Sequence, residues 1–375
     1  DVLLPALYSP QTKLDLLIAN YNTVLHGNTI VAYPGTYGPE QLGQLTAGLG
    51  LPALIDNVAN NAIVPQPMQA GPADSNLVVN ANAAVYANKL ALLLEDNVDI
   101  YGSVYAEENL LIASLFKDVN FVSAVVRIYS QSANSSTMQD VLIQEAYAAA
   151  GRRLKIFAGN NVEFKGARTE SGADTEVRAL NNIRSMPTAL LYERVEQYWH
   201  KRKTVYTRNQ SITQHSASHT SNTGSVDMQA GTGVGVFASQ IKAKQSFIAK
   251  SDQPGGTIIA GVPEVYTTQV EIHETKKRLT GNKHLHFSHS AQRITNKPVV
   301  IDALQIDVAG YTTSISDLHS NTRQLNITAV TEAALLLGKK SLKAVTVTSS
   351  RDPWWVKKRV QGAQHATFSE CQLPN

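Results

Sequence analysis

The chain has 375 residues, with 33 Lys and Arg, 30 Asp and Glu, and 43% hydrophobic content. Apolar residues run through the whole length, which excludes a long disordered chain, and the charged fraction of only 17% excludes a coiled coil rich in Glu and Lys. No stretch reaches the roughly 18 consecutive apolar residues of a membrane-spanning helix. The single cysteine, Cys371, rules out a disulfide within the chain.

Residues 1–80 are poor in charge and rich in Pro, Gly, Asn and Ala. This composition predicts an extended arm with short helices at 11–20 and 39–48. The region 81–203 is expected to be mainly helical, with one β-favouring segment at 121–129, because its apolar residues recur at helical spacing. The helices are predicted at 82–99, 105–117, 138–157 and 185–203.

The pattern changes at residue 204, after which apolar and polar residues mostly alternate. Alternation predicts strands, and a short helix is expected at 331–337. No internal repeat of 20–50 residues is visible. The predicted fold class is α+β, with an extended N-terminal arm, a helix-rich N-terminal half and a β-rich, basic region at 204–375. The strands are predicted at 204–213, 224–238, 245–250, 256–262, 265–275, 284–290, 298–308, 311–316 and 343–349.

Charge divides the chain into two parts of opposite sign. Residues 1–150 hold four basic and thirteen acidic groups, a net charge of −9, whereas residues 151–375 hold 29 basic and 17 acidic groups, a net charge of +12. Such asymmetry is typical of a protein that turns a basic surface toward nucleic acid; the alternative is that both parts are simply solvated. The candidate nucleic-acid-facing residues are Arg152, Arg153, Lys155, Lys201, Arg202, Lys203, Lys276, Lys277, Arg278, Lys357, Lys358 and Arg359.

Motifs for catalysis are missing from the sequence. Gly231, Gly233 and Gly235 resemble a dinucleotide loop, but Val236 occupies the position of the third small residue. Weak candidates for a metal site are His273, His284 and His286, which are predicted to lie on neighbouring strands. We therefore expect no cofactor, no small-molecule substrate and no enzymatic activity, and an unfamiliar metal-dependent enzyme is kept as an alternative.

The alternating stretch 226–238 is interpreted as a half-buried strand. It is also about as long as a membrane-spanning strand, so a secreted pore-forming toxin with an inserting hairpin near 204–250 is a second alternative. The leading hypothesis is a viral or phage coat protein that assembles with copies of itself around nucleic acid in the virion. Asp1 at the first position suggests cleavage from a precursor.

Overall fold

The computed structural model describes residues 24–32, 77–81, 83–94, 96–200, 203–252, 254–278, 281–335 and 345–349. These described residues form strands and no helix, so the predicted helix-rich first half is wrong. The segments expected to be helices at 82–99, 105–117, 138–157 and 185–203 are strands and turns, and the expected helix at 331–337 begins inside a strand. The helices predicted at 11–20 and 39–48 lie outside the described residues.

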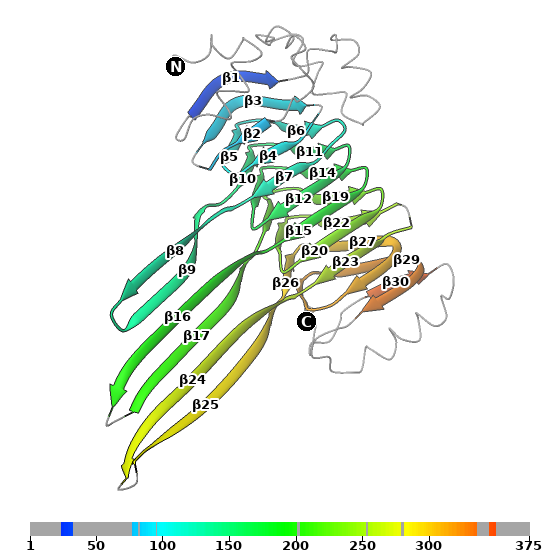
Figure 1. Cartoon of the computed structure of the whole chain (residues 1–375). Coiled ribbons are helices and arrows are strands. Elements are labelled where there is room, and N and C mark those ends of the chain that lie inside the picture. The colour runs from blue at the N-terminus through cyan, green and yellow to red at the C-terminus, as the bar shows by residue number, and fades with distance from the viewer. Residues whose placement is uncertain are drawn as a thin grey trace.

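The main body is a parallel β-solenoid with three walls (Figure 1). Each coil contributes one strand to each wall, and each strand pairs in parallel with the corresponding strand of the next coil. Wall 1 contains β5 (Ser103–Ala106), β10 (Tyr147–Ala150), β13 (Arg168–Ser171), β18 (Ser218–Ser221), β21 (Gln240–Ala243), β26 (Val299–Asp302) and β28 (Leu318–Asn321).

Wall 2 contains β6 (Leu110–Ser114), β11 (Leu154–Ala158), β14 (Thr175–Ala179), β19 (Val226–Ala230), β22 (Ser246–Ser251) and β30 (Val345–Ser349). Wall 3 contains β2 (Leu77–Val79), β4 (Val98–Ile100), β7 (Val119–Val122), β12 (Asn161–Lys165), β15 (Asn182–Met186), β20 (Gly233–Phe237) and β23 (Gly256–Ala260). Four longer strands complete the walls: β1 (Val24–Ala32), β3 (Ala84–Leu94), β27 (Gln305–Ile315) and β29 (Gln324–Leu335).

The solenoid has a regular repeat that the sequence conceals. Where one coil follows another directly, equivalent residues lie 19 to 23 positions apart. Asn161 and Asn182, whose side chains are hydrogen-bonded, are separated by 21. Where a hairpin is inserted between two coils, the offset grows with the length of the hairpin: it is 44 positions between Leu110 and Leu154, 51 between Thr175 and Val226, and 60 between Gln240 and Val300. The inserted hairpins leave the corner between walls 3 and 1. The expectation that the chain has no internal repeat is therefore corrected, because the insertions break the period.

Three hairpins leave this corner, after β7, β15 and β23, and project from the same side of the solenoid (Figure 1). They join into one antiparallel sheet in the order β25-β24-β17-β16-β9-β8. The strands are β8 (Ala124–Ser132), β9 (Ser135–Gln144), β16 (Thr188–His200), β17 (Lys203–His215), β24 (Val262–Arg278) and β25 (Gly281–Lys297).

The spacing of the hairpins, one in every second coil, matches the spacing of strands in a β-sheet. Neighbouring strands lie about 4.8 Å apart, so two coils advance about 9.6 Å along the solenoid, which is also the width of one two-stranded hairpin. The three hairpins can therefore meet edge to edge without a gap. In the intervening coils the same corner is turned by a residue with positive φ, namely Gly166 (59°), Ala238 (42°) and Asp317 (47°).

The solenoid interior is apolar and close-packed. Alternate residues of the walls point inward, and the alternating stretch 226–238 forms β19 and β20, whose Val226, Met228 and Val236 are fully buried. The stretch is thus strand with one buried side, as predicted, but it forms two short strands in different walls where a single strand was predicted at 224–238. Phe121 and Phe164 stack in consecutive coils, with 5.0 Å between ring centroids.

Candidate interaction surfaces

The hairpin sheet is a single layer in which large apolar side chains are exposed on both faces. We call face 1 the face that carries Tyr129, and face 2 the face that carries Ile128. Sheets normally bury one face against another layer, yet on face 1 Tyr129 is 70% exposed, Ile294 is 60% exposed and Trp199 is 73% exposed. The cross-strand register places these apolar residues on face 1: Tyr129, Met138, Leu191, Val195, Trp199, Tyr206, Ile212, Val265 and Ile294.

The charges near the root of face 1 are paired within the face. Arg127 Nε and Nη2 donate to the two carboxylate oxygens of Asp140 at 2.7 and 3.0 Å, and Arg208 Nη2 donates to Glu193 Oε2 at 2.7 Å. A partner that covers this part of face 1 therefore meets matched charges rather than a field of one sign.

Asp140 also ties the first hairpin to the second. Its Oδ2 accepts a hydrogen bond from the backbone N–H of Leu191 at 3.1 Å, so one carboxylate connects β8, β9 and β16. The hydrogen bond from Arg127 lowers the pKa of Asp140 below its usual value. The carboxylate is only 9% exposed, so its contacts are largely shielded from water.

The distal edge of the hairpin sheet is stepped, because the strand lengths increase from 9 and 10 to 13 and 13 and then to 17 and 17 residues. Four extra residues correspond to about 13 Å of strand. Pairing of β16 with β9 stops at Glu196, and pairing of β24 with β17 stops at Glu274. Beyond Glu196, β16 has no described strand on its β9 side. Beyond Glu274, β24 has no described strand on its β17 side.

Residues of two predicted basic clusters, Lys203 and 276–278, belong to this stepped end. Lys203 pairs with Glu274, two positions before Lys276, so the backbone of Lys203 and that of residues 276–278, which are far apart in sequence, belong to the same end of one sheet. Lys201 and Arg202 lie outside the described residues, as do Lys357, Lys358 and Arg359. Positive charge at an unpaired edge also discourages pairing with other strands.

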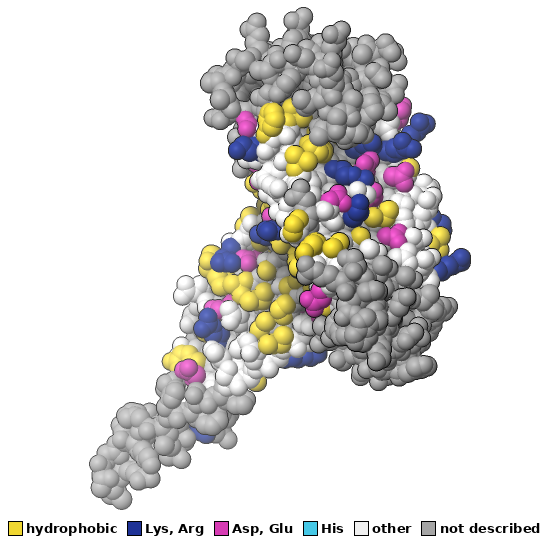
Figure 2. Space-filling view, turned by 90° about the vertical axis from the view of Figure 1, so that its right-hand side faces the viewer, with side chains coloured by type: hydrophobic (Ala, Val, Ile, Leu, Met, Phe, Trp, Pro, Cys, Tyr) yellow, Lys and Arg dark blue, Asp and Glu magenta, His cyan; other side chains and the backbone are white. Residues whose placement is uncertain are grey.

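The predicted cluster of Arg152, Arg153 and Lys155 lies instead on the solenoid. In Figure 2, basic and acidic side chains are interspersed on this flank of the solenoid. Lys155 Nζ lies 3.2 Å from Glu176, and Arg178 Nη2 lies 3.1 Å from Glu176 and 2.8 Å from Asp227. The basic side chains of this ladder are matched by carboxylates from adjacent coils.

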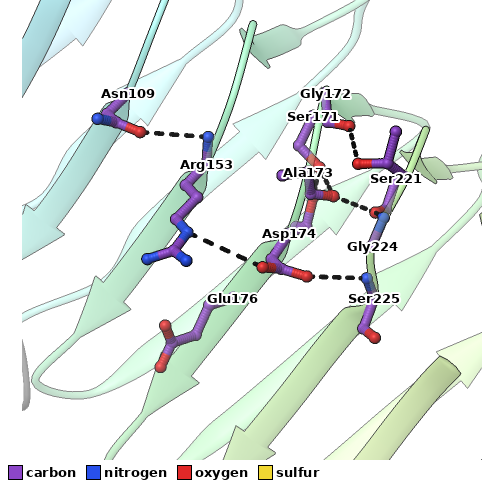
Figure 3. Close-up of polar contacts among 12 residues, drawn as sticks. Asn109, Arg153, Ser171, Gly172, Ala173, Asp174, Glu176, Ser221, Gly224 and Ser225 are labelled. Atoms are coloured by element: carbon purple, nitrogen blue, oxygen red, sulfur yellow. Dashed lines mark hydrogen bonds and ion pairs between the residues drawn. The ribbon is translucent and has the colours of Figure 1, made fainter. Parts of the chain in front are cut away.

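The neighbouring turns between walls 1 and 2 are stacked through polar contacts (Figure 3). Arg153 Nε lies 3.9 Å from Asp174 Oδ2, while the N–H of Ser225 donates to Asp174 Oδ1 at 3.0 Å. Ser221 Oγ donates to the carbonyl of Ala173 and accepts from the N–H of Gly224. These contacts provide hydrogen-bond partners for backbone groups of successive turns. The residues therefore have a structural role in the solenoid.

His219 is a buried polar residue whose environment the sequence does not reveal. Its Nδ1 lies 2.8 Å from Thr169 Oγ1 and its Nε2 lies 2.8 Å from Ser185 Oγ, and its side chain is fully buried. Burial lowers the pKa of His219 to about 3, so the imidazole is neutral near pH 7. Without an accompanying carboxylate or access to solvent, this group fits a structural role.

A ladder of amide side chains at the corner between walls 2 and 3 is also missed by sequence reasoning. Asp118 Oδ1 accepts hydrogen bonds from Asn160 Nδ2 at 2.8 Å and from Asn161 Nδ2 at 3.1 Å, and Asn182 Nδ2 donates to Asn161 Oδ1 at 3.0 Å. Asn161 and Asn182 are separated by 21 positions, as are Asn97 and Asp118. This spacing was the available signal of the repeat.

The candidate metal residues lie in the third hairpin. The backbone register pairs His273 with His286 and Thr275 with His284, but these side chains are outside the described part. Among the side chains that are described, no group of three or more His, Cys, Asp or Glu is arranged to hold a metal ion. The metal site therefore stays a prediction.

The segment expected to form an inserting hairpin at 204–250 is divided between two structures. Its first part is β17, one arm of the second hairpin, and the remainder forms solenoid strands from β18 to β22. The described residues also contain no helix with the length and apolar character needed to cross a membrane.

Comparison of the chain with known proteins identifies no relative. No protein-family model matches the chain, and neither the curated proteins nor the solved structures contain a significant match to it.

Proposed function

We propose that this chain is a structural protein that assembles with copies of itself through face 1 of the hairpin sheet, as a coat subunit of a virus or phage does. The supporting observation is a single-layer sheet that exposes Tyr129 and Ile294 on a face whose root charges are already paired. The roots of two such faces can meet without leaving Arg127, Asp140, Arg208 or Glu193 buried and unpaired, which would be costly.

The size of the face suits this role. Six strands about 4.8 Å apart, with about ten residues each at roughly 3.3 Å per residue, give one face an area of roughly 950 Å². A standard protein interface buries about 800 Å² on each partner. Face 1 is thus large enough for a specific contact between two copies.

Two matched substitutions test this proposal. Ile294→Lys places a charge on face 1, and Ile128→Lys places the same charge at a 51% exposed isoleucine on face 2. We expect Ile294→Lys to dissociate the assembly in sedimentation velocity experiments and Ile128→Lys to leave it intact. Equal behaviour of the two variants, both with unchanged circular dichroism, contradicts the use of face 1.

We further propose that the stepped end of the sheet faces a polyanion such as the nucleic acid of a particle. The support is the backbone register that brings Lys203 and residues 276–278 to one end. Binding to single-stranded DNA should then weaken steeply with salt, and Lys276→Gln/Lys277→Gln should reduce affinity. If these substitutions cause aggregation with unchanged DNA binding, the lysines protect the sheet edge instead.

A further inference from the structure

A groove of about 800 Å³ lies on the solenoid, away from the hairpin sheet, where β21, β26 and β28 of wall 1 approach the turns toward wall 2. Its charged lining consists of Lys242, Lys244, Arg323 and Asp302. Three cations and one carboxylate give the groove a local charge of about +2.

The cations of this groove are not neutralised as they are in the ladder of Lys155 and Arg178. Lys242, Lys244 and Arg323 are exposed, and none of them forms an ion pair with a described residue, although the register pairs Lys242 with Asp302. Three cations that converge on one groove, with no ion pair to the described part of the chain, attract an anionic group.

The remaining lining supplies hydrogen-bonding groups and no aromatic ring. Asp302 Oδ1 accepts a hydrogen bond from Asn321 Nδ2 at 3.2 Å, and the second carboxylate oxygen has no hydrogen bond to a described residue. Asn222 and Asn321 add exposed amides. Bases of single-stranded nucleic acids are held largely by stacking on aromatic rings, which this lining does not provide.

We infer that the groove binds an acidic oligosaccharide, whose carboxylate or sulfate groups contact Lys242, Lys244 and Arg323 and whose hydroxyls donate to Asp302. The mixture of cations with a carboxylate acceptor suits a ligand that carries both acid groups and hydroxyl donors. This site is independent of the proposed assembly through face 1.

The test uses the whole protein and four probes in calorimetric titrations: a sulfated oligosaccharide, an oligogalacturonate, inorganic sulfate and oligo(dT). We expect one of the two oligosaccharides to bind, and Lys242→Gln/Lys244→Gln to weaken that binding about 100-fold, since each lost charged contact is worth about a factor of ten. Lys165→Gln, at an exposed lysine on wall 3, is the matched control and should change the affinity less than twofold.

Asp302→Asn separates a sugar from a bare anion. It replaces the carboxylate oxygen left for a sugar hydroxyl by an NH2 donor. Oligosaccharide binding should therefore weaken relative to the binding of inorganic sulfate or oligo(dT), which gains from loss of the negative charge without losing a hydroxyl contact. The inference is overturned if neither oligosaccharide binds, if oligo(dT) binds more tightly than both, or if Lys165→Gln weakens binding as much as the double variant. Unchanged circular dichroism of each variant establishes that the fold is retained.

Discussion

The imidazole of His219 lies edge-on against the ring of Phe164, with 4.7 Å between ring centroids and 77° between ring planes. Phe164 in turn stacks on Phe121 in the preceding coil. The histidine thus continues an aromatic stack inside the solenoid, and its two ring nitrogens are satisfied by Thr169 and Ser185. Because this polar group is held neutral within the core, the solenoid should be sensitive to acid.

Lowering the pH should destabilise the protein through His219. Its pKa is about 3 in the fold, against an ordinary value of 6.5, so the unfolded chain binds more protons between these values. The stabilisation is complete above about pH 6.5 and decreases as the pH falls, by about 1.4 kcal/mol per pH unit. Urea unfolding should show a loss of about 2 kcal/mol between pH 6.5 and 5. In His219→Gln this part of the pH dependence should vanish, and an unchanged slope would contradict the assignment.

Gly172→Ala should destabilise the solenoid strongly. A Cβ atom at Gly172 would lie 1.8 Å from the carbonyl oxygen of Gly151 in the preceding coil, so the coils must separate. Gly233→Ala is the control, because its Cβ would lie 3.1 Å from Asn182 Oδ1 and 3.3 Å from the carbonyl oxygen of Gly256, so shifts of only a few tenths of an ångström are needed. We expect a loss of about 3 kcal/mol or more for the first and less than about 1 kcal/mol for the second in urea unfolding. Similar losses would refute the close stacking of the turns.

Asp118→Ala should open the amide ladder at the corner between walls 2 and 3. Asp118 Oδ1 accepts hydrogen bonds from both side-chain amides of Asn160 and Asn161 and from the backbone of Asn161. We expect a loss of about 2–3 kcal/mol, since donors in a half-buried site lose their acceptor. Asp99→Ala removes a carboxylate with a single side-chain bond, from Asn120, and should cost about 1 kcal/mol. Thermal unfolding of both variants checks this ranking, which fails if Asp99→Ala costs as much.

Asp140→Ala should loosen the first hairpin from the second without unfolding the solenoid. The carboxylate accepts from Arg127 and from the backbone N–H of Leu191. Hydrogen exchange at Leu191 should accelerate about tenfold or more when its acceptor is lost, while amides of buried solenoid strands such as β19 keep their protection. Exchange that accelerates equally in both regions would show that the hairpins and the solenoid open together.

Strands are predicted correctly from the sequence where one face of the strand is exposed to solvent. In β19 and β22, inward residues such as Val226 and Phe247 alternate with outward Asp227 and Ile248, and the alternation is visible in the sequence. In β6 all five residues from Leu110 to Ser114 are buried, and a continuous apolar run does not distinguish a strand from a helix. The helix predicted at 105–117 covers this run.

The interaction surfaces were harder to predict because they depend on long-range register. Leu191, Val195 and Tyr198 recur at helical spacing, yet they lie on β16, in a sheet that is open on both faces and shows no single apolar side. Lys203 pairs with Glu274 because hairpins from alternate coils lie side by side. The same hairpins interrupt the repeat that Asn161 and Asn182 show, so the repeat is hidden in the sequence. The basic clusters can be recognised in the sequence, but the sequence does not show that Lys203 and residues 276–278 belong to one end of the sheet.

Face 1 of the hairpin sheet is proposed as an interface between copies of this chain. The most direct measurement is the mass of the intact protein in solution, by sedimentation equilibrium from about 1 to 100 μM at physiological salt. We predict a mass that rises to at least twice the 40.6 kDa of one chain within this range. A mass that stays at 40.6 kDa throughout would contradict the claim.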